Sequence, residues 1–178
     1  MSYSYPWTCP PNPSPSLRTA LAYISASEQC DDKKLADTLD PTLEHSILPQ
    51  SLQRPQVLSK TLYLEYFRGF GKMFQKPIRR TIHEVIEMGD HIVIHASANG
   101  QSITGHEYNN EYMIVFRMMA SSTGDGSRKI GSVKEFADSQ ASSSFIPAER
   151  RRIAAAEAEA RAAARATQGQ SNLARTRR

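Results

Sequence analysis

The sequence predicts an α+β domain with three N-terminal helices packed on one face of a curved antiparallel sheet. Apolar residues recur at helical spacing in the first part of the chain, whereas from Ile78 onward they alternate with a period of two, as in strands. Turn-forming pairs such as Gly89-Asp90 and Asn99-Gly100 separate the alternating segments. A run of helices followed by a run of strands is typical of the α+β class. Helices that cross a curved sheet leave a pocket between the two layers.

Three helices are expected before the main strands. The first covers residues 17–29, where the apolar positions share one face: Leu17, Ala20, Leu21 and Ile24. Asp31 or Asp32 is a candidate N-cap for a short second helix that ends at Leu39, before Asp40-Pro41. A third helix begins at Ser59 or Lys60 and is the most aromatic of the chain, with Leu62, Tyr63, Tyr66, Phe67, Phe70, Met73 and Phe74. We expect this helix to form part of the pocket wall.

A short strand is expected over residues 43–49, and four longer strands follow the third helix. They cover residues 78–88, 91–98, 106–119 and 129–139, and the short connections between them predict an antiparallel meander. From Tyr108 onward the even positions of the third of these strands are apolar or carry two tyrosines and an asparagine, and the odd positions before Met113 are polar. Because strand side chains alternate between faces, one face is predicted to meet the core and the other to meet water or a partner.

Composition divides the chain into four segments. Residues 1–16 contain five prolines and are predicted to be an extended arm, either loosely attached or with its aromatics covering a hydrophobic patch. Residues 17–148 form the α+β domain. Residues 149–166 are rich in alanine and arginine and predict a helix that gains little from packing. Residues 167–178 are expected to be disordered.

Charge and composition argue against several classes of function. Residues 149–178 contain eight arginines and three glutamates, so the net charge of +4 comes from the tail and the main domain is near neutral. The main domain lacks the basic and aromatic surface that nucleic-acid binding requires. Apolar runs are too short for a membrane span, and we expect a soluble, cytoplasmic protein. Cys9 and Cys30 suit neither a zinc site nor a disulfide framework.

The strand that contains Glu135 supplies the best candidate for acid–base chemistry. Glu135 shares a strand face with Val133 and Ala137, so its carboxyl is expected among apolar neighbours, near Tyr108 and Tyr112 if the last two strands pair. Burial without a counter-ion would raise the pKa of this carboxyl toward neutrality. The tyrosines would donate hydrogen bonds to a substrate carbonyl or oxyanion from opposite ends of the pocket. Alternatively, Glu135 faces solvent or a cation, and the tyrosines are ordinary core residues.

Several other residues are weaker candidates for the site. His45 is a candidate proton shuttle or a structural histidine, and Asp138 reaches the pocket only if a bulge intervenes. The remaining candidates for substrate binding are Asn110, Arg54, Tyr66, Phe67 and Phe70. His91 and His95 lie four residues apart on a strand, about 13 Å, too far for two ligands of one metal ion. We expect no metal, and the absence of a Gly-rich phosphate loop argues against a nucleotide cofactor.

Three segments in this order, after the helices, resemble the fungal branch of the SnoaL-like proteins: His45 to Pro49, Tyr108 to Tyr112, and Lys134 to Ser139. These proteins belong to the superfamily named for nuclear transport factor two, and the resemblance covers residues 17–148. It implies a cone-shaped α+β barrel with a deep pocket, commonly a homodimer. It places Tyr108, Tyr112 and Glu135 at pocket positions. An arginine that some members carry near the second helix has no counterpart in residues 36–40.

The resemblance also implies cofactor-free isomerisation, ring closure, rearrangement or epoxide opening of natural-product intermediates. The resulting hypothesis is an isomerase or cyclase of fungal secondary metabolism, acting on a polyketide, terpenoid or alkaloid by ring closure or rearrangement, of which a semipinacol-type rearrangement is one form. One alternative is a non-catalytic binding module, in which the pocket is shallow or filled and Glu135 finds an internal cation. The other is a protein that assembles through its C-terminal helix.

Overall fold

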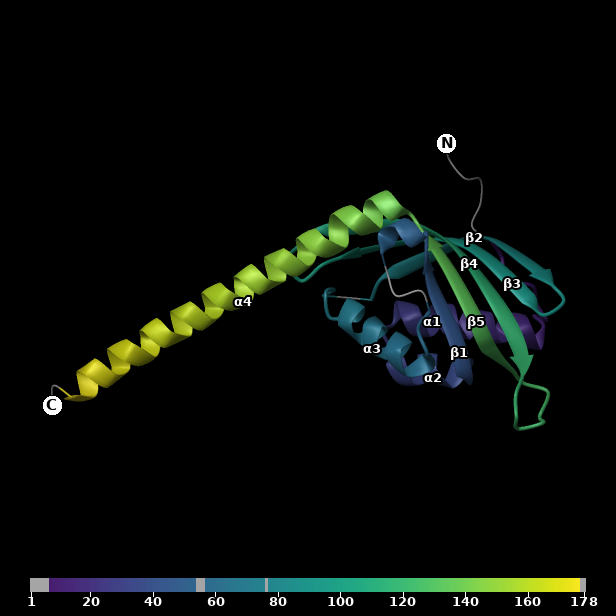
Figure 1. Cartoon of the computed structure of the whole chain (residues 1–178), viewed down its shortest axis with the longest axis horizontal. Coiled ribbons are helices and arrows are strands. Elements are labelled where there is room, and N and C mark those ends of the chain that lie inside the picture. Colours follow the sequence, from purple (N-terminus) through teal and green to yellow (C-terminus); the bar gives the residue numbers. More distant parts are fainter. Residues whose placement is uncertain (1–6, 54–56, 76, 177–178) are drawn as a thin grey trace.

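The computed structural model describes residues 7–53, 57–75 and 77–176, and it confirms the α+β class (Figure 1). Its helices and strands follow one another in the expected order, with a single 3-10 turn, η1, between the first strand and the third helix. In chain order they are α1 (Pro15–Glu28), α2 (Asp32–Thr38), β1 (Leu39–Leu48), η1 (Gln50–Leu52), α3 (Lys60–Gly71), β2 (Arg79–Met88), β3 (His91–Gln101), β4 (Glu107–Ala120), β5 (Arg128–Ala137) and α4 (Ser139–Thr176).

The strands form one curved, open sheet in the order β1-β5-β4-β3-β2 (Figure 1). The meander from β2 to β5 is antiparallel, as the sequence predicted. β1 pairs with β5 in parallel, so the expectation of an antiparallel sheet is corrected to a mixed one. A parallel pair needs a long connection, and here the whole segment from η1 to β4 supplies it.

The core lies between the concave face of the sheet and the helices α1, α2 and α3, which cover that face (Figure 1). In β4 every even position from Tyr108 to Met118 is buried, whereas Glu107, Asn109 and Glu111 are exposed. The Tyr23 ring of α1 meets the Phe116 ring edge-on, with 5.1 Å between centroids. Strand alternation therefore assigns the two faces as the sequence indicated.

The last helix differs from the prediction at both ends. α4 begins at Ser139, ahead of the expected start at residue 149, and it continues to Thr176 through most of the segment expected to be disordered. The Ser-rich first turns and Pro147 argued against a helix there. The side chains of Phe145 and Ile146 pack into or against the core, and this packing outweighs the poor local propensity. Beyond its first turns α4 extends away from the domain (Figure 1).

A buried carboxylate fixes the base of α4. The Glu149 side chain is fully inaccessible, and the Thr104 hydroxyl lies 2.7 and 2.9 Å from its two oxygens. The Arg152 guanidinium donates to the same carboxylate at 3.0 Å. These contacts hold α4 against the loop between β3 and β4.

The N-terminal arm docks on the edge of the sheet, as one of the two expectations for it proposed. The Trp7 backbone N–H donates to the Ile82 carbonyl at 3.1 Å, and the indole packs against the core. Tyr3 and Tyr5 lie outside the described residues. Among the described helices, none combines the length and apolar character that a membrane crossing requires.

Candidate functional site

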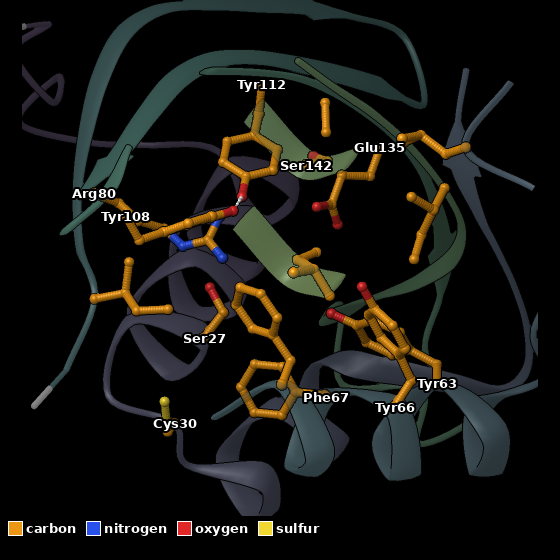
Figure 2. A pocket seen from close by; sticks show the side chains of 16 residues that line it. Ser27, Cys30, Tyr63, Tyr66, Phe67, Arg80, Tyr108, Tyr112, Glu135 and Ser142 are labelled. Atoms are coloured by element: carbon orange, nitrogen blue, oxygen red, sulfur yellow. Dashed lines mark hydrogen bonds between the residues drawn. The ribbon is translucent and has the colours of Figure 1, made fainter. Parts of the chain in front are cut away.

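A cavity lies between α3, the sheet and the first turns of α4 (Figure 2). Its volume is about 40 Å³, enough for a few water molecules. It is thus smaller than the deep pocket that the sequence resemblance implied. Tyr66, Phe67 and Phe70 of α3 form one wall, as expected. Tyr66 and Phe70 are only partly buried, so this wall is also where the cavity approaches solvent. A ligand of natural-product size requires these side chains to move.

Glu135 faces the cavity, as the alternation of β5 predicted. Its side chain is 19% exposed, and one carboxylate oxygen lies 3.6 Å from His45 Nε2. Burial raises the pKa of Glu135, whereas the His45 imidazole and the Arg80 guanidinium lower it by more, so the net pKa lies below its usual value. The expectation of an unpaired carboxyl with a raised pKa is therefore wrong. At neutral pH Glu135 is an ionised base.

His45 is held rigidly beneath Glu135. Its backbone exchanges two hydrogen bonds with Leu58, at 2.9 and 2.7 Å. Its ring stacks on Tyr63 of α3, with 3.9 Å between centroids and 13° between planes. Within the described part of the chain neither ring nitrogen has a partner at normal hydrogen-bond length, and Nε2 lies 3.6 Å from the Glu135 carboxylate. His45 is positioned to orient the carboxylate.

Tyr108 and Tyr112 meet in the cavity instead of lying at opposite ends of it, which corrects the sequence-based expectation. Their hydroxyls are hydrogen-bonded to each other (Figure 2). The two side chains lie on the same face of β4, and their rings tilt together so that the phenol oxygens converge. Burial raises the pKa of both phenols, so both stay protonated at neutral pH.

Asn110 extends this hydrogen-bond chain toward α4. Its Oδ1 accepts backbone N–H groups from Glu111 at 2.8 Å and Asp138 at 3.1 Å. Its Nδ2 therefore donates to Tyr108 Oη at 3.1 Å and to Ser142 Oγ at 2.9 Å. Tyr108 Oη accepts from Asn110 and can accept a second hydrogen bond, so either phenol can be the donor in the bond between Tyr108 and Tyr112. In both arrangements one of the two hydroxyl protons has no acceptor among the described residues and is available to a ligand.

Arg80 is a functional candidate that the sequence analysis missed. It comes from β2, and its guanidinium carbon lies 5.5 Å from the centre of the Tyr112 ring. Figure 2 shows Arg80, Tyr112 and Glu135 entering the cavity from different sides. Burial lowers the pKa of Arg80, and the neighbouring Tyr112 and Glu135 raise it by more. The available signal was strand alternation, since Arg80 shares a face with the apolar Ile78 and Ile82.

Three of the predicted substrate-binding residues are not part of the described cavity. Asn110 does not line it, but it contacts Tyr108 and Ser142, which do. Asp138 is exposed, and its carboxylate caps α4 by accepting N–H groups from Gln140 at 2.8 Å and Ala141 at 3.3 Å. The bulge that Asp138 would need to reach the cavity is absent, because residues 135–137 pair with β4 in unbroken register. Arg54 lies outside the described residues.

The histidines of β3 pair with separate carboxylates. His95 Nε2 lies 2.6 Å from Glu111, and His91 Nδ1 lies 2.6 Å from Asp90. Within residues 7–53, 57–75 and 77–176, no group of three or more His, Cys, Asp or Glu side chains is arranged to hold a metal ion. The ionisable side chains that line the cavity are a carboxylate, a guanidinium, a thiol and four phenols: Glu135, Arg80, Cys30, Tyr63, Tyr66, Tyr108 and Tyr112. His45 contacts Glu135 but does not line the cavity.

No family model and no curated protein matches this sequence. Solved structures do match it. The BvnE pinacolase from Penicillium brevicompactum aligns with a TM-score of 0.64 and 20% identity, covering 79% of this chain and 96% of its own. A protein from Jannaschia named as a SnoaL-like polyketide cyclase aligns with a TM-score of 0.60 and 14% identity, covering 79% and 96%. The chain has the SnoaL-like fold.

A third neighbour, TerC, was co-crystallised with polyporic acid. It aligns with a TM-score of 0.61 and 19% identity, covering 75% of this chain and 99% of its own. In all three comparisons most of the neighbour is covered, so the shared part is the complete SnoaL-like fold. The sequence resemblance is thus confirmed at the level of the fold.

Proposed function

We propose that this protein is an isomerase or cyclase that rearranges a polyketide, terpenoid or alkaloid intermediate of fungal secondary metabolism by acid–base catalysis, without a metal or cofactor. The observation that carries the proposal is the placement around one cavity of an ionised carboxylate, Glu135, and of the hydrogen-bonded phenols Tyr108 and Tyr112, which together leave one hydroxyl proton for a ligand. A base and a hydrogen-bond donor on the two sides of a substrate are what proton abstraction beside an oxygen function requires.

Each polar residue has a separate part in the proposed reaction. Glu135 accepts a proton from the substrate and returns it at a second position. Tyr112 donates a hydrogen bond to the substrate oxygen, while Tyr108 donates to the Tyr112 hydroxyl. His45 acts on Glu135 and is a positioning residue. Tyr66, Phe67 and Phe70 pack against the apolar body of the substrate.

The activities and the ligand that appear in the names of the structural neighbours support this proposal. BvnE is named as a pinacolase and the Jannaschia protein as a polyketide cyclase. TerC was crystallised with a small organic acid. Rearrangement, ring closure and small-molecule binding are therefore chemistries with which this fold is associated.

A second candidate function is non-catalytic binding of a small molecule. The small cavity, about 40 Å³, and the Arg80 guanidinium that lowers the pKa of Glu135 favour it, since a small cavity and an internal cation were expected of a binding module. The two candidates differ in turnover. Purified protein is incubated with carbonyl-containing biosynthetic intermediates in the presence of a chelator and without added cofactors, and products are analysed by chromatography and mass spectrometry. A product isomer, or one changed only by loss of water, supports the enzyme; unchanged substrate with measurable binding supports the module.

Substituting the two tyrosines one at a time tests which of them donates the hydrogen bond to the substrate oxygen. We expect Tyr112→Phe to lower turnover by about 10²-fold, because it removes the hydrogen bond to the substrate oxygen. Tyr108→Phe leaves the Tyr112 proton in place and is expected to cost clearly less. Initial rates at saturating substrate measure both. A greater loss in Tyr108→Phe would mean that Tyr108, and not Tyr112, donates to the substrate oxygen.

The pH dependence of turnover follows from the lowered pKa of Glu135. The folded-state pKa lies below its ordinary value of 4.5, so the carboxylate stays ionised as the pH falls from about 7 to about 5. We expect turnover to be constant over this range and to decrease only at lower pH, where Glu135 accepts a proton. A rate profile measured on protein that remains folded, as judged by circular dichroism, tests this. A rate that falls already near neutrality would contradict the assignment of Glu135 as the base.

A further inference from the structure

The Arg80 guanidinium is a cation without a direct counter-ion. Among the described residues no carboxylate lies within 4.0 Å of it, and its Nε is buried without a hydrogen-bond acceptor. Arginine stays protonated at any relevant pH. The Tyr112 ring, 5.5 Å away, offers only a cation–π contact. A buried N–H without an acceptor costs free energy, which a ligand oxygen at this position would recover.

The groups around Arg80 determine which other contacts a ligand bound there would make. The Tyr112 ring faces the guanidinium, and its hydroxyl belongs to the phenol pair that leaves one proton for a ligand. Glu135 enters the cavity from another side (Figure 2). A planar ligand between them therefore has two donors at one side and a base at the other. This arrangement separates the atom that loses a proton from the atom that gains charge.

We propose that Arg80 binds the oxygen on which negative charge develops, and that the substrates are enolisable carbonyl compounds; this inference rests on the proposed function. The Glu135 carboxylate removes a proton from the carbon beside the carbonyl, so that the C–H bond breaks and an O–H bond forms on Glu135. The electron pair moves to the carbonyl oxygen, where Arg80 and Tyr112 stabilise the enolate. Return of the proton from Glu135 to another carbon completes an isomerisation and needs no further reactant.

Stable anions imitate this enolate and test the inference by binding alone. The probe is 4-hydroxycoumarin, an enol that is ionised at neutral pH, with neutral coumarin as its matched partner. Dissociation constants are measured by ligand-observed NMR and calorimetry. We expect wild-type protein to bind 4-hydroxycoumarin at least about tenfold more tightly than coumarin, and Arg80→Gln to remove this difference. Equal affinities in the wild type, no binding at millimolar concentration, or an unchanged preference in Arg80→Gln would overturn the inference.

A second pair of probes distinguishes an enolate site from a carboxylate site. Benzoate and benzamide have the same ring and differ in charge. For each pair, the preference is the ratio of the affinity for the anion to the affinity for its neutral partner. If Arg80 contributes less to the preference for benzoate over benzamide than to the preference for 4-hydroxycoumarin over coumarin, the result supports enolisable carbonyl substrates. An equal or stronger preference for benzoate would replace that assignment with a carboxylate substrate.

Three further variants make the result specific to Arg80. Arg79→Gln removes a neighbouring exposed arginine from the opposite face of β2 and is expected to leave the dissociation constants unchanged. Arg80→Lys keeps the charge, and it is expected to retain part of the preference; it is also the test variant if Arg80→Gln does not fold. Glu135→Gln resembles the protonated acid that accompanies the enolate, so it is expected to bind 4-hydroxycoumarin severalfold more tightly than wild type. A weaker affinity in Glu135→Gln contradicts the inference.

The binding measurements test the role of Arg80 and the turnover measurements test the proposed function, so either hypothesis can be refuted without the other. If Arg80→Gln keeps the preference for the anion while Glu135→Gln loses turnover, the inference about Arg80 is wrong and the proposed function stands. If Arg80→Gln loses the preference while Glu135→Gln retains turnover, the anion site stands and the proposed function is wrong.

Discussion

Replacing Glu135 with glutamine is expected to lower turnover by about 10³-fold while the protein remains folded. Glutamine has nearly the same shape as glutamate and fills the same place between Ile114 and Ile47, its partners in the sheet. Its amide cannot accept a proton at neutral pH, so the first step of the proposed reaction is lost. Initial rates of product formation, with circular dichroism to verify the fold, measure the effect. Turnover within threefold of wild type would show that Glu135 is not the base.

The matched control for this substitution is Glu111→Gln. Glu111 lies on β4, next to Tyr112 in sequence, but on the outward face, where it contacts His95 at 2.6 Å. The change in charge is the same as in Glu135→Gln, and we expect turnover to stay near that of wild type. If both variants lose turnover equally, the loss follows from the altered net charge of the sheet and not from a proton acceptor in the cavity.

Alternation along single strands was enough to predict that Tyr108, Tyr112 and Glu135 face the cavity. The period of two in β4 and β5 placed Tyr108, Tyr112 and Glu135 on the inward face, and the short turns predicted their antiparallel pairing. Alternation does not reveal which non-consecutive strands become neighbours. The parallel pairing of β1 with β5, which brings His45 under Glu135, therefore became visible only in the structure.

The pKa of Glu135 was predicted in the wrong direction for the same reason. Burial, which raises the pKa, was readable from the apolar residues on either side of Glu135. The two groups that lower it come from β1 and β2, and both are distant in sequence. Arg80 was overlooked because an arginine on a strand ordinarily faces solvent. Its place beside Ile78 and Ile82 was the signal that it points inward.

The start of α4 was missed because local propensity and tertiary packing disagree there. Serines and Pro147 indicate a loop, whereas the Asp138 cap and the packing of Ile146 favour a helix. This disagreement matters for the site, because the first turns of α4 supply Ser142 and Ile146 to the cavity wall. The contacts that hold α4 in place therefore also shape the cavity.

Substituting Glu149 with alanine is expected to lower the free energy of unfolding by about 3 kcal/mol at neutral pH. The change removes a fully buried carboxylate that accepts from the Thr104 hydroxyl and from Arg152. Thr104 and Arg152 then lose their shared acceptor, and α4 loses its attachment to the loop between β3 and β4. Urea denaturation monitored by circular dichroism measures the free energy. A variant as stable as wild type would show that these hydrogen bonds do not hold the helix.

The pH dependence of this difference identifies the ionised form of Glu149 as its source. Burial raises the pKa of Glu149, whereas hydrogen bonds from Thr104, Ser102 and Arg152 lower it by more, so the folded-state pKa lies below the unfolded value. The stabilisation is therefore fully present above the unfolded pKa, about 4.3, and is lost as the pH falls through the lower folded pKa. We expect the gap between wild type and Glu149→Ala to narrow over that interval. Glu157→Ala, one exposed member of an ion pair with Arg161 on the same helix, is expected to change stability little at any pH. A gap that is independent of pH would instead assign the effect to lost packing.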